Sequence, residues 1–231
     1  MGKLKLKSKH RLMCGDSTVK ENVDKLMNGE KADMVFTDPP YGISANKQTL
    51  GSGKKNFIRG GDWDIKRPDM SIYLDMNIPT IIWGGNYFSD VLKPTNDWLC
   101  WHKKNDGLSF SEFELAWTNL GKNCRHLSHQ WSGEKKDHPT QKPMPVMLWC
   151  LEFAGKLNKI LDPFLGSGST LIACEKTNRK CFGMELDEHY CSVIIQRYID
   201  FVGGSSKVLL TSNDGDKTLE EVFKMRDKKG I

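Results

Sequence analysis

The sequence contains no long hydrophobic run. Hydrophobic residues make up 38% of its 231 positions, and no stretch approaches the roughly 20 consecutive apolar residues needed to cross a bilayer. The basic segment from Lys3 to Arg11 is not followed by an apolar stretch of the kind that directs export. The sequence therefore predicts a cytoplasmic protein without a membrane partner, built as one globular domain.

Paired cysteines are also missing. The seven cysteines are odd in number and include no Cys-x-x-Cys pair, so we expect free thiols in a reducing compartment rather than a disulfide framework. Cys124, His126 and His129 lie close together in the sequence, but their spacing matches no familiar zinc pattern. We predict no metal site.

The excess of basic residues is small. With 34 basic and 29 acidic side chains the formal charge is +5, which is weak for a protein that binds nucleic acid by charge alone. The basic residues nevertheless gather in two glycine-rich or polar segments, where phosphate contacts would contribute affinity without reading sequence. The candidate phosphate contacts are Lys54, Lys55, Arg59, Lys122, Arg125, Lys135 and Lys136. Ordinary solvated surface remains the alternative for this set.

One short apolar run ends in a distinctive way. Residues 32–36 have the composition of a buried strand, and Asp38-Pro39-Pro40-Tyr41 follows it. The two prolines fix φ near −65° and hold the carboxylate and the aromatic ring in one geometry. The acid, the Pro39 carbonyl and the ring could together bind a flat amino-bearing ring such as a nucleobase. A strand-ending turn with a surface aspartate remains the alternative.

A glycine-rich loop occurs later in the chain. Asp162-Pro163-Phe164-Leu165-Gly166-Ser167-Gly168-Ser169-Thr170 lies between a predicted strand over 159–161 and a predicted helix over 169–176. This context is typical of a nucleotide-type site. A P-loop would need lysine where Ser169 stands, and the dinucleotide fingerprint would need a small residue where Leu171 stands. Glu185 ends the next predicted strand, at about the 20-residue offset at which an acid binds ribose hydroxyls. A helix is predicted after it, from Glu188 to about Val202.

The pattern on either side predicts an α/β fold. A strand over 10–14, an amphipathic helix with Val23 and Leu26 on one face, and the strand before Asp38 form a βαβ unit. Its parallel strands place Asp16 and Asp38 at the same sheet edge. Most tryptophans fall within strand-like runs, which favours core packing over base stacking.

Both motifs resemble those of one enzyme family. Asp38–Tyr41 resembles the catalytic motif of the amino-group DNA methyltransferases, and Asp162–Thr170 resembles their S-adenosylmethionine loop. The order of the motifs is similar to that of the β class, in a small, phage-like form. The resemblance covers about residues 10–202 and implies a doubly wound, mostly parallel sheet of Rossmann type, circularly rearranged so that the catalytic half comes first.

The resemblance also implies a domain plan. We expect a methyltransferase domain over 1–204, with a catalytic half over about 10–118 and a cofactor half over about 138–202. A short target-recognition region would occupy about 119–137, and its small size is typical of a phage-like or stand-alone enzyme. Residues 205–231 would be a C-terminal extension of unknown role.

The family's site residues carry over to matching positions. Asp38, Pro39, Pro40 and Tyr41 would be catalytic and would act on a base extruded from duplex DNA. S-adenosylmethionine would be bound by Asp16, Asp38, His138, Thr140, Lys142, Asp162, Phe164, Gly166, Gly168, Ser169, Thr170 and Glu185. Within this set, Asp16 would accept from the adenine amino group and His138, Thr140 and Lys142 would hold the methionine end, although helix capping also explains the segment 138–143.

Several alternatives remain open at this level. Adenine-N6 is favoured over cytosine-N4 because the family's cytosine enzymes more often carry Ser where Asp38 stands. RNA and protein methyltransferases with related sites more usually begin the motif with Asn. A non-catalytic nucleic-acid-binding module is the alternative outside the enzymes. Double-stranded DNA is the expected partner, and a homodimer and a cognate restriction endonuclease are further partners that the resemblance leaves open.

Overall fold

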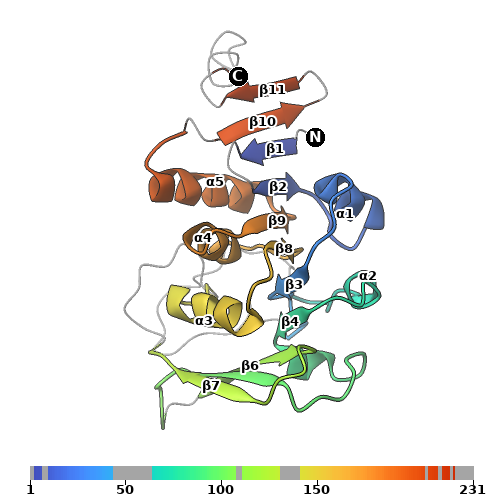
Figure 1. The fold of residues 1–231 in the computed structure, drawn as a ribbon, viewed down its shortest axis with the longest axis vertical. Coiled ribbons are helices and arrows are strands. Elements are labelled where there is room, and N and C mark those ends of the chain that lie inside the picture. Colours follow the sequence, from blue (N-terminus) through green and yellow to red (C-terminus); the bar gives the residue numbers. More distant parts are fainter. Residues whose placement is uncertain are drawn as a thin grey trace.

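The protein is organised around a single sheet. The computed structural model describes residues 3–6, 10–43, 64–107, 111–130, 141–205, 208–212, 215–218 and 221. Within these residues, eleven strands form one mixed sheet in the order β11-β10-β1-β2-β9-β8-β3-β4-β6-β5-β7. Figure 1 shows the sheet running from β11 near the C-terminal end to β7 at the opposite end. Across these ranges, no helix is both long and apolar enough to span a bilayer.

The centre of the sheet is parallel. Its strands are β2 (Arg11–Cys14), β9 (Lys180–Glu185), β8 (Lys159–Asp162), β3 (Met34–Thr37) and β4 (Thr80–Trp83). Adjacent members pair in parallel. All four residues of β3 and of β4 are buried, as expected for strands that are covered on both faces.

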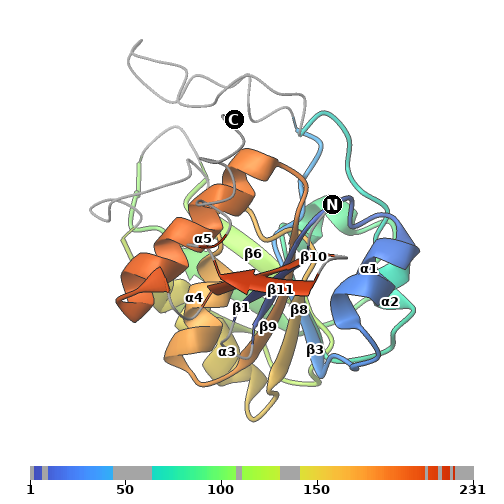
Figure 2. The ribbon, with the colours of Figure 1, turned by 90° about the horizontal axis from the view of Figure 1, so that it is seen from above.

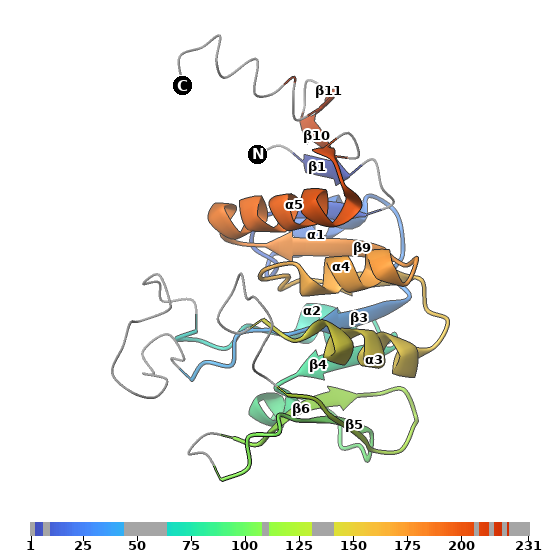
Figure 3. The same cartoon turned by 90° about the vertical axis from the view of Figure 1, so that its left-hand side faces the viewer.

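Helices cover both faces of this centre. In Figure 2, α1 (Lys20–Met27) and α2 (Ser71–Leu74) lie on one side, and α3 (Met144–Ala154), α4 (Ser169–Lys176) and α5 (Glu188–Val202) lie on the other. Figure 3 shows α5, α4 and α3 stacked in that order along the sheet. Helix α1 buries Val23, Leu26 and Met27, the spacing that places side chains on one helical face.

The two ends of the sheet are antiparallel or mixed. Beyond β4 and the 3-10 turn η2 (Gly85–Phe88) come β6 (Phe113–Thr118), β5 (Trp98–His102) and β7 (Arg125–Ser128). At the other end, β1 (Lys3–Leu6) pairs with β10 (Val208–Ser212), and β10 pairs with β11 (Gly215–Thr218). Strands β10 and β11 of the C-terminal extension therefore extend the sheet beyond β1, which pairs with β2 on its other side.

The predicted fold class is confirmed. Helices α4 and α5 have the bounds expected from the sequence, and Trp83, Trp101 and Trp117 are buried core residues. Strand β7 lies in the region expected to recognise the target. Its residues are mostly exposed, so it gave no hydrophobic pattern from which a strand could be predicted.

The strand order has a switch point between β3 and β8. From β3 the chain continues to its neighbour β4, whereas from β8 it continues to β9 on the opposite side, and β3 and β8 are themselves paired. In open α/β sheets, ligands bind outside the carboxyl ends of strands at such a switch point. Asp38 directly follows β3 and Asp162 ends β8.

Candidate active site

The Asp-Pro-Pro-Tyr segment forms a compact group at the end of β3. The Tyr41 hydroxyl donates a hydrogen bond to Asp38 Oδ1 at 2.5 Å. The Tyr41 ring stacks on that of Tyr87 from η2, with centroids 4.9 Å apart and planes inclined by 15°. Burial and the nearby carboxylates raise the pKa of the Tyr41 hydroxyl, which therefore stays protonated as a donor.

A glycine after β4 makes room for the Tyr41 ring. Gly84 has φ of +65°, and a Cβ placed on it would lie 2.1 Å from Tyr41 Cε1. Only glycine combines this backbone conformation with so close an approach. The turn between β4 and η2 is thus shaped around the aromatic residue of the motif.

Asp162 connects the two motifs by hydrogen bonds. Its Oδ1 accepts a hydrogen bond from Thr37 Oγ1 at 2.8 Å, across the ends of β8 and β3, and another from the Phe164 amide at 3.1 Å. Burial raises the pKa of Asp162 to about 7, against the lowering effect of the hydrogen bonds from Thr170, Thr37 and Phe164. The side chain is therefore an interior link whose charge changes near neutral pH.

Glu185 organises the glycine-rich loop. Its two carboxylate oxygens accept hydrogen bonds from the backbone amides of Gly166 and Asp187, at 2.8 and 2.9 Å. Burial raises the pKa of this carboxyl. A carboxylate has about four acceptor sites, more than these backbone amides occupy, so Glu185 can hold the loop and still accept a hydrogen bond from a ligand hydroxyl.

The glycine-rich loop leads into a helix whose first turn has no side-chain cap. Gly166 and Gly168 have φ of +57° and +86°, and helix α4 begins at Ser169 without a side-chain cap. The Ser169 hydroxyl is buried without a hydrogen-bond partner. A buried polar group normally has a partner, and uncapped helix amides with an unpartnered hydroxyl suit a polar ligand.

Asp16 lies at the same edge, after β2. Its Oδ1 accepts from the Thr18 amide and hydroxyl at 2.8 and 2.7 Å, which forms the turn into α1. The next residue, Ser17, accepts through its carbonyl a 2.5 Å hydrogen bond from Tyr73, and the Tyr73 ring meets that of Phe164 edge-on. Tyr73 thus connects the Asp16 turn to the glycine-rich loop, a role that the sequence pattern did not indicate.

The Lys142 side chain contacts the catalytic motif through Asp38. Its Nζ is 2.6 Å from Asp38 Oδ2 and 3.0 Å from Glu114 Oε2. Sequence reasoning did not identify Glu114. The available signal was a single acidic residue inside the otherwise apolar run of β6 (Phe113–Thr118).

The remaining predicted residues fall into two sets, one outside the described residues and one within them. His138, Thr140, Lys54, Lys55, Arg59, Lys135 and Lys136 lie outside the described residues. The Lys122 ammonium donates to the carbonyl of Phe153 and lies over its ring, so it packs on α3. Arg125 is exposed at the start of the edge strand β7.

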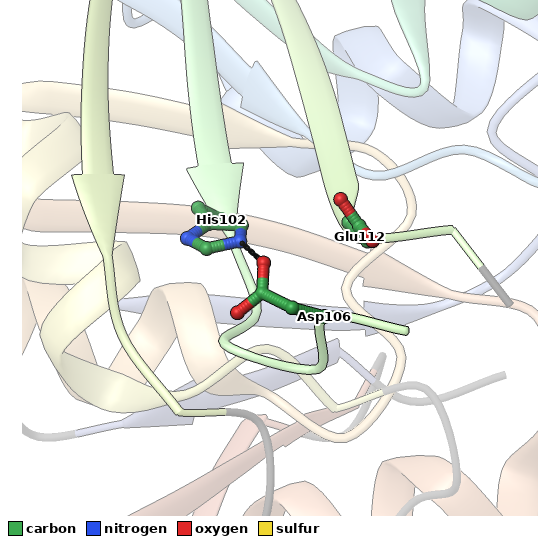
Figure 4. A group of neighbouring side chains, drawn as sticks. All are labelled: His102, Asp106 and Glu112. Atoms are coloured by element: carbon green, nitrogen blue, oxygen red, sulfur yellow. Dashed lines mark hydrogen bonds and ion pairs between the residues drawn. The ribbon is translucent and has the colours of Figure 1, made fainter. Parts of the chain in front are cut away.

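A second cluster has the donor types of a cation site. His102, Asp106 and Glu112 place ligand atoms within 4.8 Å of one another near the turn between β5 and β6 (Figure 4). Local bonding already explains this arrangement. His102 Nε2 lies 2.9 Å from Asp106 Oδ1, and Glu112 Oε1 accepts from the Gly107 amide at 3.3 Å. These contacts close the turn between the strands.

Comparison with known proteins decides the family. Residues 78–197 match the model of the N6/N4 methyltransferases, described as DNA methylase. The chain belongs to this family. It is an amino-group DNA methyltransferase. One relative is the type II methyltransferase M2.LlaDCHI of Lactococcus lactis subsp. cremoris, 24% identical over 73% of this chain and 82% of the relative.

Solved structures show the same fold. The complex of M1.HpyAVI with SAM has a TM-score of 0.54 at 24% identity, over 80% of this chain and 98% of that one. PvuII DNA methyltransferase, which is cytosine-N4-specific, has a TM-score of 0.53 at 13% identity, over 84% of this chain and 87% of that one. At these identities the likeness concerns the fold, and it does not distinguish adenine from cytosine as the target.

Proposed function

We propose that this methyltransferase transfers a methyl group from S-adenosylmethionine to the N6 amino group of adenine in duplex DNA. The observation that carries the proposal is the placement of the Asp38–Tyr41 group beside the Asp162–Thr170 loop at one switch point, joined by the hydrogen bond from Thr37 to Asp162. An acceptor and an aromatic platform then adjoin a loop suited to a nucleoside-bearing methyl donor. The type II relatives support a cognate restriction endonuclease as a functional partner.

The cofactor supplies an electrophilic methyl group, and the chain's own residues position it. Glu185 would accept from the ribose hydroxyls, and Asp16 and Phe164 would face the adenine end. The Ser169 hydroxyl has no protein partner, and α4 begins without a side-chain cap. His138 and Thr140 are proposed for the methionine end on the resemblance of their segment alone.

The target amine must be oriented before it can react. Its lone pair is conjugated with the purine ring and becomes nucleophilic when its protons are drawn out of the ring plane. We assign Asp38 and the Pro39 carbonyl as the acceptors of these two N–H groups. The extruded base would stack on the face of the Tyr41 ring opposite to Tyr87. Asp38 can take this role because each of its oxygens keeps a lone pair beside its existing hydrogen bond.

Adenine is proposed over cytosine on the identity of Asp38 alone. The two targets present the same amino group to the carboxylate, so the site geometry accepts either. We keep cytosine-N4 methylation as the second candidate because a cytosine-N4-specific enzyme shares the fold.

The test is direct. Unmethylated duplex DNA is incubated with S-adenosylmethionine labelled in the methyl group, digested to nucleosides and chromatographed, and the modified sites are mapped. We expect label in N6-methyladenine. Label in N4-methylcytosine would reassign the base, label in RNA or protein alone would reassign the substrate, and absence of transfer to any of them would leave a binding module.

A further inference from the structure

The catalytic carboxylate is held from both sides by protein donors. Asp38 Oδ1 accepts from the Tyr41 hydroxyl, and Oδ2 accepts from Lys142 Nζ at 2.6 Å. Lys142 in turn lies 3.0 Å from Glu114, whose other oxygen is 2.9 Å from Lys103 Nζ. The four charged groups contain two carboxylates and two ammonium ions, so their formal charges cancel.

Lys142 has little freedom in this position. Its side chain is only 6% exposed, and its ammonium lies over the ring of Trp83 at 5.1 Å from the centroid. Burial alone would lower the pKa of Lys142, but Asp38 and Glu114 outweigh that effect and raise it. An ammonium removed from water needs fixed partners, and the two carboxylates provide them.

Glu114 is the anchor of this arrangement. Burial opposes its ionisation, but Lys142 and Lys103 together lower the pKa of Glu114 below its usual range. Its backbone is fixed in β6, whose residues pair with both β4 and β5. Glu114 thus connects the rigid sheet to a lysine that lies in the connection before α3.

We propose that Glu114 and Lys142 are positioning residues for methyl transfer. Glu114 holds the Lys142 ammonium, and this ammonium, together with the Tyr41 hydroxyl, fixes the plane of the Asp38 carboxylate that accepts from the target amine. A displacement of about 1 Å in such a group can cost a hundredfold in rate. The inference rests on the proposed function. The resemblance placed Lys142 at the methionine end of the cofactor, whereas in this arrangement its partners are the Asp38 and Glu114 carboxylates.

Glu114→Gln tests the proposal with little change of shape. We expect kcat to fall by roughly tenfold or more, since Lys142 loses one of its two carboxylate partners, while the KM for DNA and the affinity for S-adenosylmethionine change by less than about twofold. A purely structural residue would lower stability without this division between kcat and KM. An unchanged kcat in the folded variant would overturn the proposal.

A matched control lies at the other ends of the strands. Glu30 likewise holds several cations, with Arg11 at 2.9 Å, Lys180 at 2.6 Å and Lys159 at 3.3 Å. Lys159 and Lys180 begin β8 and β9, the ends opposite to the site. Glu30→Gln should reduce thermal stability and leave kcat within about twofold of the wild-type value. An equal loss of kcat in Glu114→Gln and Glu30→Gln would indicate a general effect on folding and would overturn the positioning role of Glu114.

A double substitution tests the route of the effect. If Glu114 acts through Lys142, then Glu114→Gln combined with Lys142→Met should be no slower than Lys142→Met alone, because coupled residues are not additive. If the loss of kcat in the double variant equalled the product of the two single losses, the proposal that Glu114 acts through Lys142 would be overturned. Where Glu114→Gln alone fails to fold, Glu114→Gln with Lys103→Met removes one charge of each sign and should show the same loss of kcat.

The two proposals fail in different ways. A wild-type protein that methylates no DNA contradicts the proposed function itself. A wild-type protein that methylates DNA, with Glu114→Gln indistinguishable from it in kcat, contradicts only the positioning role.

Discussion

At the scale of single residues, Asp38 is the proposed acceptor of the target amine. Its side chain is 30% exposed, and its two oxygens accept from Tyr41 and Lys142. Asp38→Ala should reduce the single-turnover rate of methylation by roughly a hundredfold or more, as for other groups that bind a reacting centre. Rates are measured at saturating cofactor, with circular dichroism to verify the fold. A folded variant that keeps a tenth of the wild-type rate would contradict the assignment.

Tyr41 combines a stacking face with a hydroxyl that bonds to Asp38. Tyr41→Phe keeps the ring against Tyr87 and loses the 2.5 Å hydrogen bond, so we expect a moderate loss of rate. Tyr41→Ala removes a stacking surface worth about 1–3 kcal/mol per base and should abolish most turnover. With 2-aminopurine at the target position, the alanine variant should give brighter emission because its extruded base is unstacked. Equal emission and equal rates for Phe and Ala would remove Tyr41 from the base site.

Asp162 predicts a pH dependence of stability. Burial raises its pKa in the folded protein from 3.8 to about 7, so the folded state binds this proton more tightly than the unfolded state. Its contribution to the free energy of unfolding is complete below about pH 4 and is lost as the pH rises through about 7. The difference in stability between Asp162→Asn and wild type, measured by urea unfolding without cofactor, should shift in favour of the variant between about pH 5 and 8. If the unfolding free energies of Asp162→Asn and wild type changed in parallel with pH, the raised pKa of Asp162 would be contradicted.

At the scale of elements, the turn between β4 and η2 shapes the platform. Gly84→Ala would bring a methyl group to 2.1 Å from the Tyr41 ring at a residue with φ of +65°. We expect displacement of Tyr41 and loss of methylation. Gly29→Ala is the matched control because Gly29 has φ of +80° and nothing within 4 Å of the added carbon, so it carries backbone strain only. Similar activity in both variants would show that the contact with Tyr41 is unimportant.

At the scale of the whole molecule, the terminal strands lie away from the site. Strand β10 pairs with β1, whereas Asp38 follows β3 and Asp162 ends β8, two strands at the centre of the sheet. A chain ending at Ser205 should keep kcat within about twofold of the full-length value and unfold at a lower temperature, because β1 loses β10 and keeps only β2 as a partner. Methylation assays and thermal denaturation measure the two effects. A folded but inactive shortened protein would show that β10 and β11 support the site.

Local sequence determined much of the fold and the two motif loops. Proline, glycine and apolar periodicity act within a few residues, so they predicted the strand before Asp38, the helices over 169–176 and 188–202, and the parallel centre. The structure places Asp38, Tyr41 and Glu185 at one sheet edge. The roles assigned to these residues remain predictions. Strand β7 was missed because an exposed edge strand is stabilised by pairing with β5 rather than by a hydrophobic pattern.

Only the tertiary structure decided which charged and aromatic side chains meet. Asp38 and Lys142 are 104 positions apart, and their contact with Glu114 depends on the order of strands and the path into α3. Tyr87 and Tyr41 likewise meet only because β4 lies beside β3. Hydrophobic periodicity records which side of an element is buried, and it carries no information about the partner across the core. The motifs therefore predicted the candidate site, and the packing of the sheet supplied the groups that contact it.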